Sequence, residues 1–183
     1  MPNKIKNEDY WLDLAQYIYD HDPACHSVDE ALNLYPGLQA LRVHDLAHQA
    51  YLVGDFTVAR RLSEDSKRQT GIEIHPGAQI GDHVFIDHGT GVVIGETAIV
   101  GDRVKMYHGT TLGGRGNEKG VKRHPTIEHD VEIGANAIIL GNVTVGHHSR
   151  IGAGAVVLQD VPPYATAVGV PARIIDRSQD YII

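Results

Sequence analysis

The sequence is poor in several features that would define other protein classes. It has one cysteine, one tryptophan and two phenylalanines among 183 residues. Because Cys25 has no second cysteine to pair with, it can form neither an internal disulfide nor a thiolate metal cluster, and we interpret it as structural. A formal net charge of −7 argues against nucleic acid as a partner.

Long apolar segments are also absent. No run approaches the roughly 18 residues that a helix needs to span a bilayer. The first residues, Met1 to Lys6, lack the apolar stretch of a secretory signal. We therefore expect a cytoplasmic protein with no membrane contact.

What the sequence does contain is an aliphatic residue at every sixth position over a long stretch. These residues are Ile127, Ile133, Ile139, Val145, Ile151 and Val157. The fourth residue after each of the first five is small or β-branched, namely Val131, Ala137, Val143, Ser149 and Ala155. Three six-residue sides make a triangular coil of about 18 residues, and stacked coils bury such a column in a parallel β-helix.

The same repeat occurs earlier in two phases. The first phase contains Ile74, Ile80, Ile86 and Val92, and the second contains Ile94, Val100 and Met106. The shift between them predicts a small insertion near residues 87–93. The segment 112–126 has the glycine and charge content of a solvated loop, and interruptions of a strict repeat tend to carry function.

The first 70 residues lack the repeat and predict helices. The spacing of Trp11, Leu14 and Ile18 indicates a helix that ends near Asp20–Pro23. Ser27 begins a capping box that opens a second helix. A third amphipathic stretch has Leu38, Leu41, Leu46 and Ala47 on its apolar face, and a fourth runs over residues 56–68 and is stopped by Gly71.

We thus predict an α+β protein in three parts. They are a helical head domain at 1–70, a β-helix domain at 71–175 with the loop 112–126, and a C-terminal tail at 176–183. The head should cover one end of the β-helix and residues 161–173 should close the other, since open coils expose unpaired backbone groups. The flat outer sides favour packing on copies of the chain, and we expect a cyclic trimer.

Several motifs resemble those of the bacterial serine O-acetyltransferases. They are IEIHPGA at 72–78, IDHGTGVVIGET at 86–97, TLGG at 111–114, KRHP at 122–125 and GVPAR at 169–173. The pattern D-H-x-T-G-x-V-x-G-E-T followed by R-H-P is far more specific than the hexapeptide repeat. The resemblance covers roughly residues 20–175. It implies a trimeric left-handed β-helix, often paired into hexamers through the head, that moves acetyl from acetyl-CoA to the L-serine hydroxyl and gives O-acetylserine, the precursor of cysteine.

This chemistry needs a base, because a serine hydroxyl is a poor nucleophile at neutral pH. We assign His88 as the base, since imidazole titrates in the right range. A carboxylate on the other ring nitrogen would fix the tautomer. Glu73 is the candidate, 15 residues before His88 and on an adjacent coil, and the resemblance supports this pairing.

Serine carries a carboxylate and an ammonium group, so its site should hold charges of both signs. Arg123 offers the planar fork that suits a carboxylate, and the resemblance implies that Arg123 and His124 both contact serine. Asp87 is the matching anion. The resemblance also aligns Asp22 with a head residue that reaches the amino acid, although a helix-end cap is the alternative interpretation.

Acetyl-CoA needs a slot in which small residues let its thin arm approach the backbone. We expect Gly113, Gly114, Ala135 and Ala153 to line it, with Arg173 or Lys122 near the phosphates, although β-helix corners need glycine in any case. Transfer should be direct in a ternary complex, because no acyl-enzyme nucleophile lies in the motifs. No metal site is expected.

The tail resembles family tails whose terminal isoleucine enters the active site of O-acetylserine sulfhydrylase. Ile183 would fill an apolar pocket while its carboxylate imitates that of an amino acid. The alternative interpretation is a frayed terminus with no binding role.

Some positions depart from the family pattern. Asp45 stands where an arginine is common, which puts head packing and hexamer formation in question. His108 replaces a common glutamine, and Arg115 a common threonine, near the presumed acceptor and CoA sites.

Three alternatives stay open from the sequence. The chain could acetylate homoserine or a sugar hydroxyl, or serve as a non-catalytic partner of a sulfhydrylase. It could also resemble the trimeric β-helix carbonic anhydrases that hold zinc with three histidines across a subunit interface. His83 with His88, or His124 with His129, have suitable separations for that site.

Overall fold

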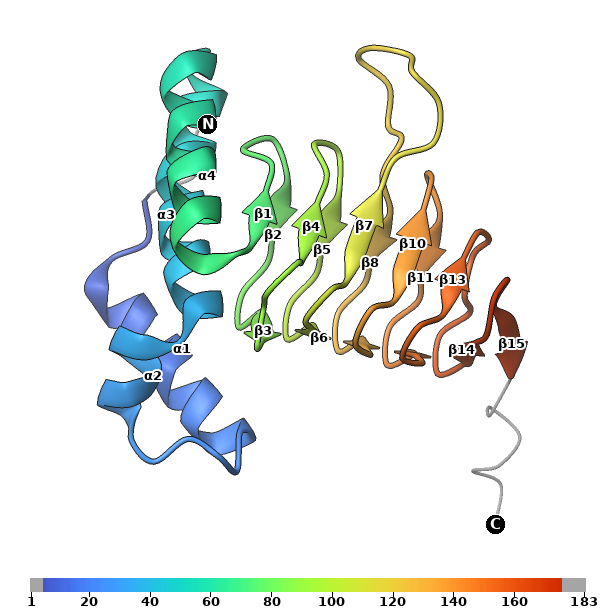
Figure 1. The fold of residues 1–183 in the computed structure, drawn as a ribbon, viewed down its shortest axis with the longest axis horizontal. Coiled ribbons are helices and arrows are strands. Elements are labelled where there is room, and N and C mark those ends of the chain that lie inside the picture. Colours follow the sequence, from blue (N-terminus) through green and yellow to red (C-terminus); the bar gives the residue numbers. More distant parts are fainter. Residues whose placement is uncertain (1–4, 176–183) are drawn as a thin grey trace.

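A computed structural model describes residues 5–175 of the chain. Four helices form a head at one end, and short strands wind into a body beside it (Figure 1). No helix within residues 5–175 is long and apolar enough to cross a membrane. The expectation for Ile183 lies outside the described residues.

The first two helices begin and end close to where the sequence predicts. Helix α1 (Glu8–His21) is capped by Asn7 and ends one residue before Asp22. Helix α2 (Val28–Leu34) is capped by Ser27, whose Oγ accepts the Glu30 amide at 3.0 Å. The Glu30 carboxylate reaches back to the amide of His26 at 2.8 Å, one residue further than a standard capping box.

Helix α3 (Pro36–Leu52) presents a different face to the core from the predicted one. Leu38, Leu41 and Ala47 are buried as expected, but Leu46 is 46% exposed. His44 takes the buried position instead, since it lies three residues after Leu41 and three before Ala47. The prediction for Leu46 was therefore wrong.

Helix α4 (Phe56–Thr70) extends two residues beyond the predicted end. Gly71 follows it with φ of 73°, the left-handed conformation in which glycine ends a helix. The Gly71 amide bonds to the Lys67 carbonyl at 2.9 Å. The chain then enters the first strand at Glu73.

The body is a triangular solenoid with three sheets, which we name A, B and C, and their strands are parallel except for the last one in sheet C. Sheet A contains β1 (Glu73–Ile74), β4 (Val93–Ile94), β7 (Thr111–Gly113), β10 (Ile138–Leu140) and β13 (Val156–Val157). Sheet B contains β2 (Gln79–Ile80), β5 (Ile99–Val100), β8 (Thr126–Ile127) and β11 (Thr144–Val145). Sheet C contains β3 (Phe85–Asp87), β6 (Lys105–Tyr107), β9 (Glu132–Ile133), β12 (Arg150–Ile151), β14 (Thr166–Val168) and β15 (Arg173–Ile175). The chain visits the sheets in the order A, B, C on each coil.

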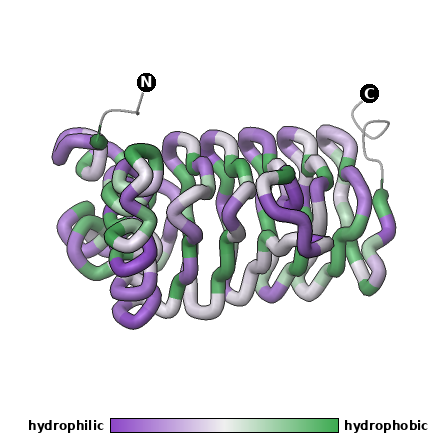
Figure 2. The backbone as a smooth tube through the Cα atoms, turned by 90° about the horizontal axis from the view of Figure 1, so that it is seen from above, coloured by the Kyte–Doolittle hydropathy of each residue, from purple (hydrophilic) through white to green (hydrophobic). Residues whose placement is uncertain are grey.

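The aliphatic column of the repeat is the core of this solenoid. All six of its residues from Ile127 to Val157 are at most 2% exposed. The corner positions also face inward, with exposed fractions from 0% for Ala137, Ser149 and Ala155 to 9% for Val143. Hydrophobic segments recur on each coil in Figure 2, whereas much of the loop after β7 is hydrophilic. The aliphatic repeat and the small or β-branched positions four residues after it thus both predict the interior correctly.

Strand register confirms the predicted insertion. Ile127 pairs with Val145, 18 positions further on, but Ile74 pairs with Ile94, 20 positions further on. The turn His88–Gly91 joins β3 to β4, and His88, Gly89 and Gly91 all have positive φ there. The second interruption is the loop between β7 and β8, whose residues 114–121 are exposed.

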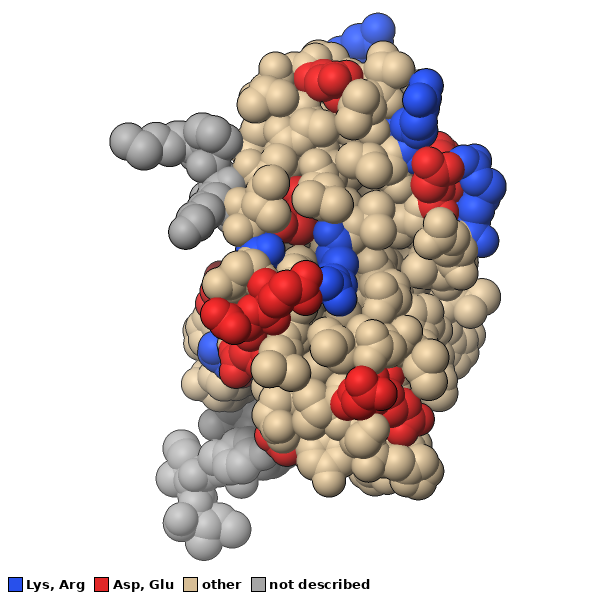
Figure 3. All heavy atoms as spheres, turned by 90° about the vertical axis from the view of Figure 1, so that its left-hand side faces the viewer, with Lys and Arg blue, Asp and Glu red and all other residues tan. Residues whose placement is uncertain are grey.

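Both ends of the solenoid are covered. At one end α3 lies against β3 so closely that a Cβ on Gly37 would stand 2.1 Å from the Ile86 carbonyl oxygen. At the other end β15 pairs antiparallel with β14. This hairpin is more regular than the irregular strand predicted for residues 161–173. Seen from the head end, the described surface carries small patches of both charge signs (Figure 3).

Candidate active site

The three corners of the solenoid are named here by the sheets they join: corner AB, corner BC and corner CA. His88 lies at corner CA, directly after β3, with φ of 59°. Its side chain is 72% exposed. The inserted turn therefore holds an imidazole on the outside of the solenoid wall.

Two predicted carboxylates lie near His88. Asp87 Oδ1 is 4.0 Å from His88 Nε2, and Asp87 Oδ2 is 3.1 Å from Lys105 Nζ. Asp22 follows α1 and accepts from the Tyr35 hydroxyl at 2.6 Å and from the Ala24 amide at 2.9 Å. Asp22 is thus both a helix-end residue and part of this corner.

Electrostatics tie Asp22 to the same group. Burial alone would raise the pKa of Asp22, but the Tyr35 hydroxyl, the Ala24 amide and the nearby side chains of Lys105 and His88 together lower it. Burial and the bond to Asp22 raise the pKa of Tyr35, so this phenol stays a donor. Burial opposes the charge on Lys105, yet Tyr107 and Asp87 raise its pKa. The corner therefore holds two anions and one half-buried ammonium around an exposed imidazole.

Glu73 forms no ion pair with His88 in this structure. Its carboxylate forms an ion pair with Lys67 of α4. Among the described residues, the acid that pairs with the His88 ring is Asp87. The assignment of Glu73 as the orienting carboxylate stays a prediction.

Arg123 and His124 lie at corner AB, at the end of the loop between β7 and β8. The amides of both residues donate to Thr97 Oγ1, at 3.0 and 3.1 Å. The Arg123 guanidinium is 3.4 Å from Glu96 Oε2. Although the loop is exposed at its start, its last residues are thus fastened to the turn after β4.

The His124 ring has a fixed tautomer. The Thr97 backbone N–H donates to His124 Nδ1 at 3.1 Å, so Nδ1 is the acceptor and the proton lies on Nε2. Burial, followed by the charge of Arg123, lowers the pKa of His124 and keeps the ring neutral. A Cβ on Gly95 would stand 2.0 Å from this ring. His124 is therefore a rigid, neutral hydrogen-bond donor.

The small residues predicted for acetyl-CoA fall in two places. Ala135 and Ala153 lie at corner CA, where the Gly154 amide bonds to the Ala135 carbonyl at 2.8 Å. They stand along the same edge as His88, on later coils. Gly113 ends β7 and Gly114 begins the loop, at the other edge of sheet A. Arg173 is exposed at the start of β15.

Lys122 does not point freely outward. Its ammonium donates to the carbonyl oxygens of His124 and Pro125, and burial lowers its pKa. Lys122 therefore holds together the last residues of the loop. Cys25 is buried, with Sγ 3.3 Å from the Ser27 carbonyl oxygen.

The histidine pairs suggested for a zinc hydrase are not brought together. His83 lies at corner BC and bonds to Asp13, whereas His88 lies at corner CA. His124 lies at corner AB and His129 at corner BC. A single chain therefore forms neither proposed pair in its described part.

Sequence reasoning missed three residues that shape the two corners. Lys105 was not singled out because its contact with Asp87 depends on β3 pairing with β6. Tyr35 lies between two predicted helices and was given no role, and Thr97 ends the motif at 86–97 without an assigned role. The ring of His108, noted as a departure, lies 5.8 Å from that of His88. Asp45, the other departure, accepts the Lys6 amide at 2.9 Å.

Comparison with known proteins adds to this geometry. A family described as bacterial transferase hexapeptide (six repeats) matches residues 124–159. A serine acetyltransferase of Bacillus licheniformis is 52% identical over 158 residues, which cover 86% of this chain and 73% of the relative. Soybean serine acetyltransferase complexed with serine has a TM-score of 0.87 at 42% identity, covering 91% of this chain and 68% of that one.

A third relative was solved with coenzyme A. Serine acetyltransferase from Brucella abortus in complex with coenzyme A has a TM-score of 0.87 at 45% identity, covering 91% of this chain and 67% of that one. The predicted fold class, helices followed by a left-handed parallel β-helix, is thereby confirmed. The chain spans between two thirds and three quarters of the length of these relatives.

Proposed function

The chain belongs to the serine acetyltransferase family, and from that premise we propose that it moves the acetyl group of acetyl-CoA to the hydroxyl of L-serine. The observation that carries the proposal is His88, an exposed imidazole held by the inserted turn between the carboxylate of Asp87 and the ring of His108. The product, O-acetylserine, would supply cysteine synthesis. A cytoplasmic location fits this role.

His88 acts as the general base. It takes the proton of the serine hydroxyl while the oxygen attacks the thioester carbonyl, and the tetrahedral intermediate then expels the CoA thiolate. The imidazolium returns its proton to that sulfur. Transfer is direct, because the one cysteine, Cys25, is buried in the head and its Sγ faces a backbone carbonyl.

The serine ammonium group binds at corner CA. Asp22 and Asp87 supply the negative charge there, and Lys105 holds Asp87 in place at 3.1 Å. Glu73 remains the proposed orienting group for His88, and it would have to leave Lys67 to act in this way. Such a dipolar pocket disfavours neutral sugars, since unpaired buried charges cost several kcal/mol.

The serine carboxylate binds Arg123 and the Nε2–H of His124. These two residues lie at corner AB, and His88 lies at corner CA, so sheet A separates them within one chain. A site that uses both corners therefore needs a second copy. We propose that the AB corner of one chain meets the CA corner of the next.

The outer face of sheet A supports this assembly. Its outward positions, in register, are Glu73, Val93, Thr111, Ile138 and Val156. The outward positions of sheet C include Lys105, Glu132 and Arg150. The more aliphatic sheet A suits contact between copies, and a cyclic trimer places one site at each interface. Pairing of trimers through the head stays open.

Acetyl-CoA lies along the same interface. Ala135 and Ala153 give its thin arm room beside the backbone on the coils that follow His88, and Gly113 and Gly114 do so across sheet A. Arg173 is the candidate for its phosphates. The predicted contact of Ile183 with O-acetylserine sulfhydrylase stays a prediction.

Thiol release from acetyl-CoA tests the proposed function. The purified protein is assayed with L-serine, L-homoserine, a sugar panel and no acceptor, beside His88→Ala. We expect serine-dependent release that falls at least a hundredfold in His88→Ala, as loss of a general base does. Turnover with homoserine alone would show that homoserine, and not serine, is the acceptor. Homoserine is included because His108, which departs from the family pattern, lies beside the base. Silence with all acceptors would refute the enzyme assignment.

A further inference from the structure

At corner BC, residues with the same backbone conformation lie above one another on successive coils. Each coil contributes one residue in the left-handed conformation there, with φ between 54° and 63°: His83, Arg103, Asp130, His148 and Tyr164. The amide of His148 bonds to the carbonyl of His129 at 3.2 Å, and that of Asp130 to the carbonyl of Asp102 at 2.9 Å. The fold itself therefore sets neighbouring corner side chains next to each other.

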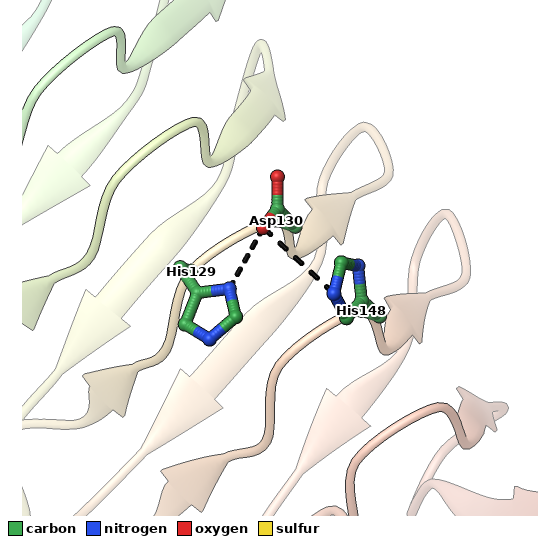
Figure 4. A group of neighbouring side chains, drawn as sticks. All are labelled: His129, Asp130 and His148. Carbon is green, nitrogen blue, oxygen red and sulfur yellow. Dashed lines mark hydrogen bonds and ion pairs between the residues drawn. The ribbon is translucent and has the colours of Figure 1, made fainter.

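Three residues at this corner carry metal-binding atoms that lie close together: Asp130 and His148 of that set, and His129, which precedes Asp130. His129 Nδ1 is 2.7 Å from Asp130 Oδ2, and His148 Nε2 is 3.9 Å from the same oxygen. The three ligand atoms lie within 4.8 Å of one another. Figure 4 shows both rings turned toward the carboxylate, one from each of two successive coils.

The surroundings orient all three groups. Arg103 donates to both Asp130 oxygens at 2.7 Å, and this bond, before all other influences, lowers the pKa of Asp130 and keeps it ionised. The His148 ring stacks on Tyr164 at 5.0 Å. The His129 ring stacks on His147 at 5.0 Å. Contacts of this kind fix the direction of metal ligands.

We propose that His129, Asp130 and His148 bind a divalent transition-metal ion of the zinc class. Two imidazoles and one carboxylate suit zinc, whereas magnesium and calcium prefer oxygen ligands alone. Ligand atoms around a tetrahedral zinc ion stand about 3.3 Å apart. The separations of 2.7 and 3.9 Å bracket that value, so small movements of two partly exposed rings complete the site.

The ion would cross-link two coils and take no part in acetyl transfer. Corner BC does not border sheet A, whereas the proposed reaction uses the two corners that do. Because Arg103 also bonds Asp130 Oδ1 through Nε, it can hold that oxygen while Oδ2 ligates the ion. The effect should therefore be on stability.

Zinc titration of the chelator-treated, untagged full chain tests the site. Calorimetry should find one zinc ion per chain, bound at least tenfold more weakly in His148→Gln and in His129→Gln. His26→Gln, an exposed histidine of the head, should bind like wild type. His147→Gln should weaken binding less than either ligand change, since its ring bonds to Glu128 and stacks on His129 but is not itself a ligand.

Thermal unfolding gives a second readout that separates binding from folding. Without zinc, His148→Gln and wild type should melt at similar temperatures, because the His148 side chain is partly exposed. With zinc in excess, only wild type should melt at a higher temperature, since an ion that binds the native state alone raises its stability. Unchanged zinc binding in His148→Gln and His129→Gln would overturn the site. So would a wild type that binds no zinc at micromolar concentrations, or a loss seen only in His147→Gln.

Discussion

At the scale of single residues, Thr97 holds the loop end that carries Arg123 and His124. Its hydroxyl accepts two amides and its own amide donates to His124. Thr97→Val removes the hydroxyl and keeps the shape. We expect the KM for serine to rise up to roughly thirtyfold, since two hydrogen bonds contribute about 1 kcal/mol each and every 1.4 kcal/mol is about tenfold.

The matched control for that change is Thr97→Ser, which keeps the hydroxyl and should keep the KM. Steady-state kinetics at varied serine and saturating acetyl-CoA separate the two variants. An unaltered KM in Thr97→Val would mean that this loop end does not bind the acceptor.

His44 makes stability depend on pH. Burial, followed by the charge of His48, lowers its pKa from 6.5 to about 3. Above pH 6.5 neither state binds the proton; below it the unfolded chain does and the native chain does not, so stability falls as pH falls toward 3. Between pH 7 and 5 this amounts to about 2 kcal/mol.

Urea unfolding at pH 7 and pH 5 tests this assignment. His44→Leu should lose about 2 kcal/mol less between the two pH values than wild type. Because His75 and His124 also have lowered pKa values, the difference between the two proteins is the informative quantity. Equal losses would show that another group carries the effect.

At the scale of elements, the contact between α3 and β3 joins the head to the solenoid. Gly37 permits it, since a Cβ there would stand 2.1 Å from the Ile86 carbonyl oxygen. Helix propensity alone predicts that Gly37→Ala stabilises α3 by up to about 1 kcal/mol. Overpacking predicts the opposite, a loss of about 1–3 kcal/mol.

The sign of the change in unfolding free energy therefore decides between the two effects. We expect destabilisation, and Leu46→Ala on the exposed side of α3 should change stability little. A Gly37→Ala protein more stable than wild type would contradict the described docking of the head.

The strands and most helix boundaries could be predicted because their signals are local. A six-residue period fixes which side chains face inward, and Gly71 ends α4 through its own backbone freedom. The buried face of α3 was only partly predicted, because a histidine fills a position that the hydrophobic pattern gives to leucine. Its burial depends on the tertiary packing of the head.

The site could be predicted only as a set of residues. Motifs supplied His88, Asp87, Arg123 and His124, but the pairing of Asp87 with Lys105 follows from a strand register that the insertion sets. Likewise, the ion pair of Glu73 with Lys67 joins a strand to α4 and leaves no signal in the repeat. Contacts between elements are what sequence periodicity cannot report.

At the scale of the whole molecule, the triangular body separates three kinds of edge. Corners CA and AB border the aliphatic sheet A and carry the proposed acetyl transfer chemistry, while corner BC carries the proposed metal site. The central claim is that His88 of one chain works with Arg123 of another. Subunit complementation tests it most directly.

In that measurement, His88→Ala and Arg123→Ala chains, each nearly inactive alone, are expressed together in equal amounts and assayed for serine-dependent thiol release. If each site takes His88 from one copy and Arg123 from the next, random trimers restore both residues at about a quarter of the interfaces, and about a quarter of wild-type activity returns. Activity that stays at the level of the separate variants would place both residues in one chain's site and contradict the account.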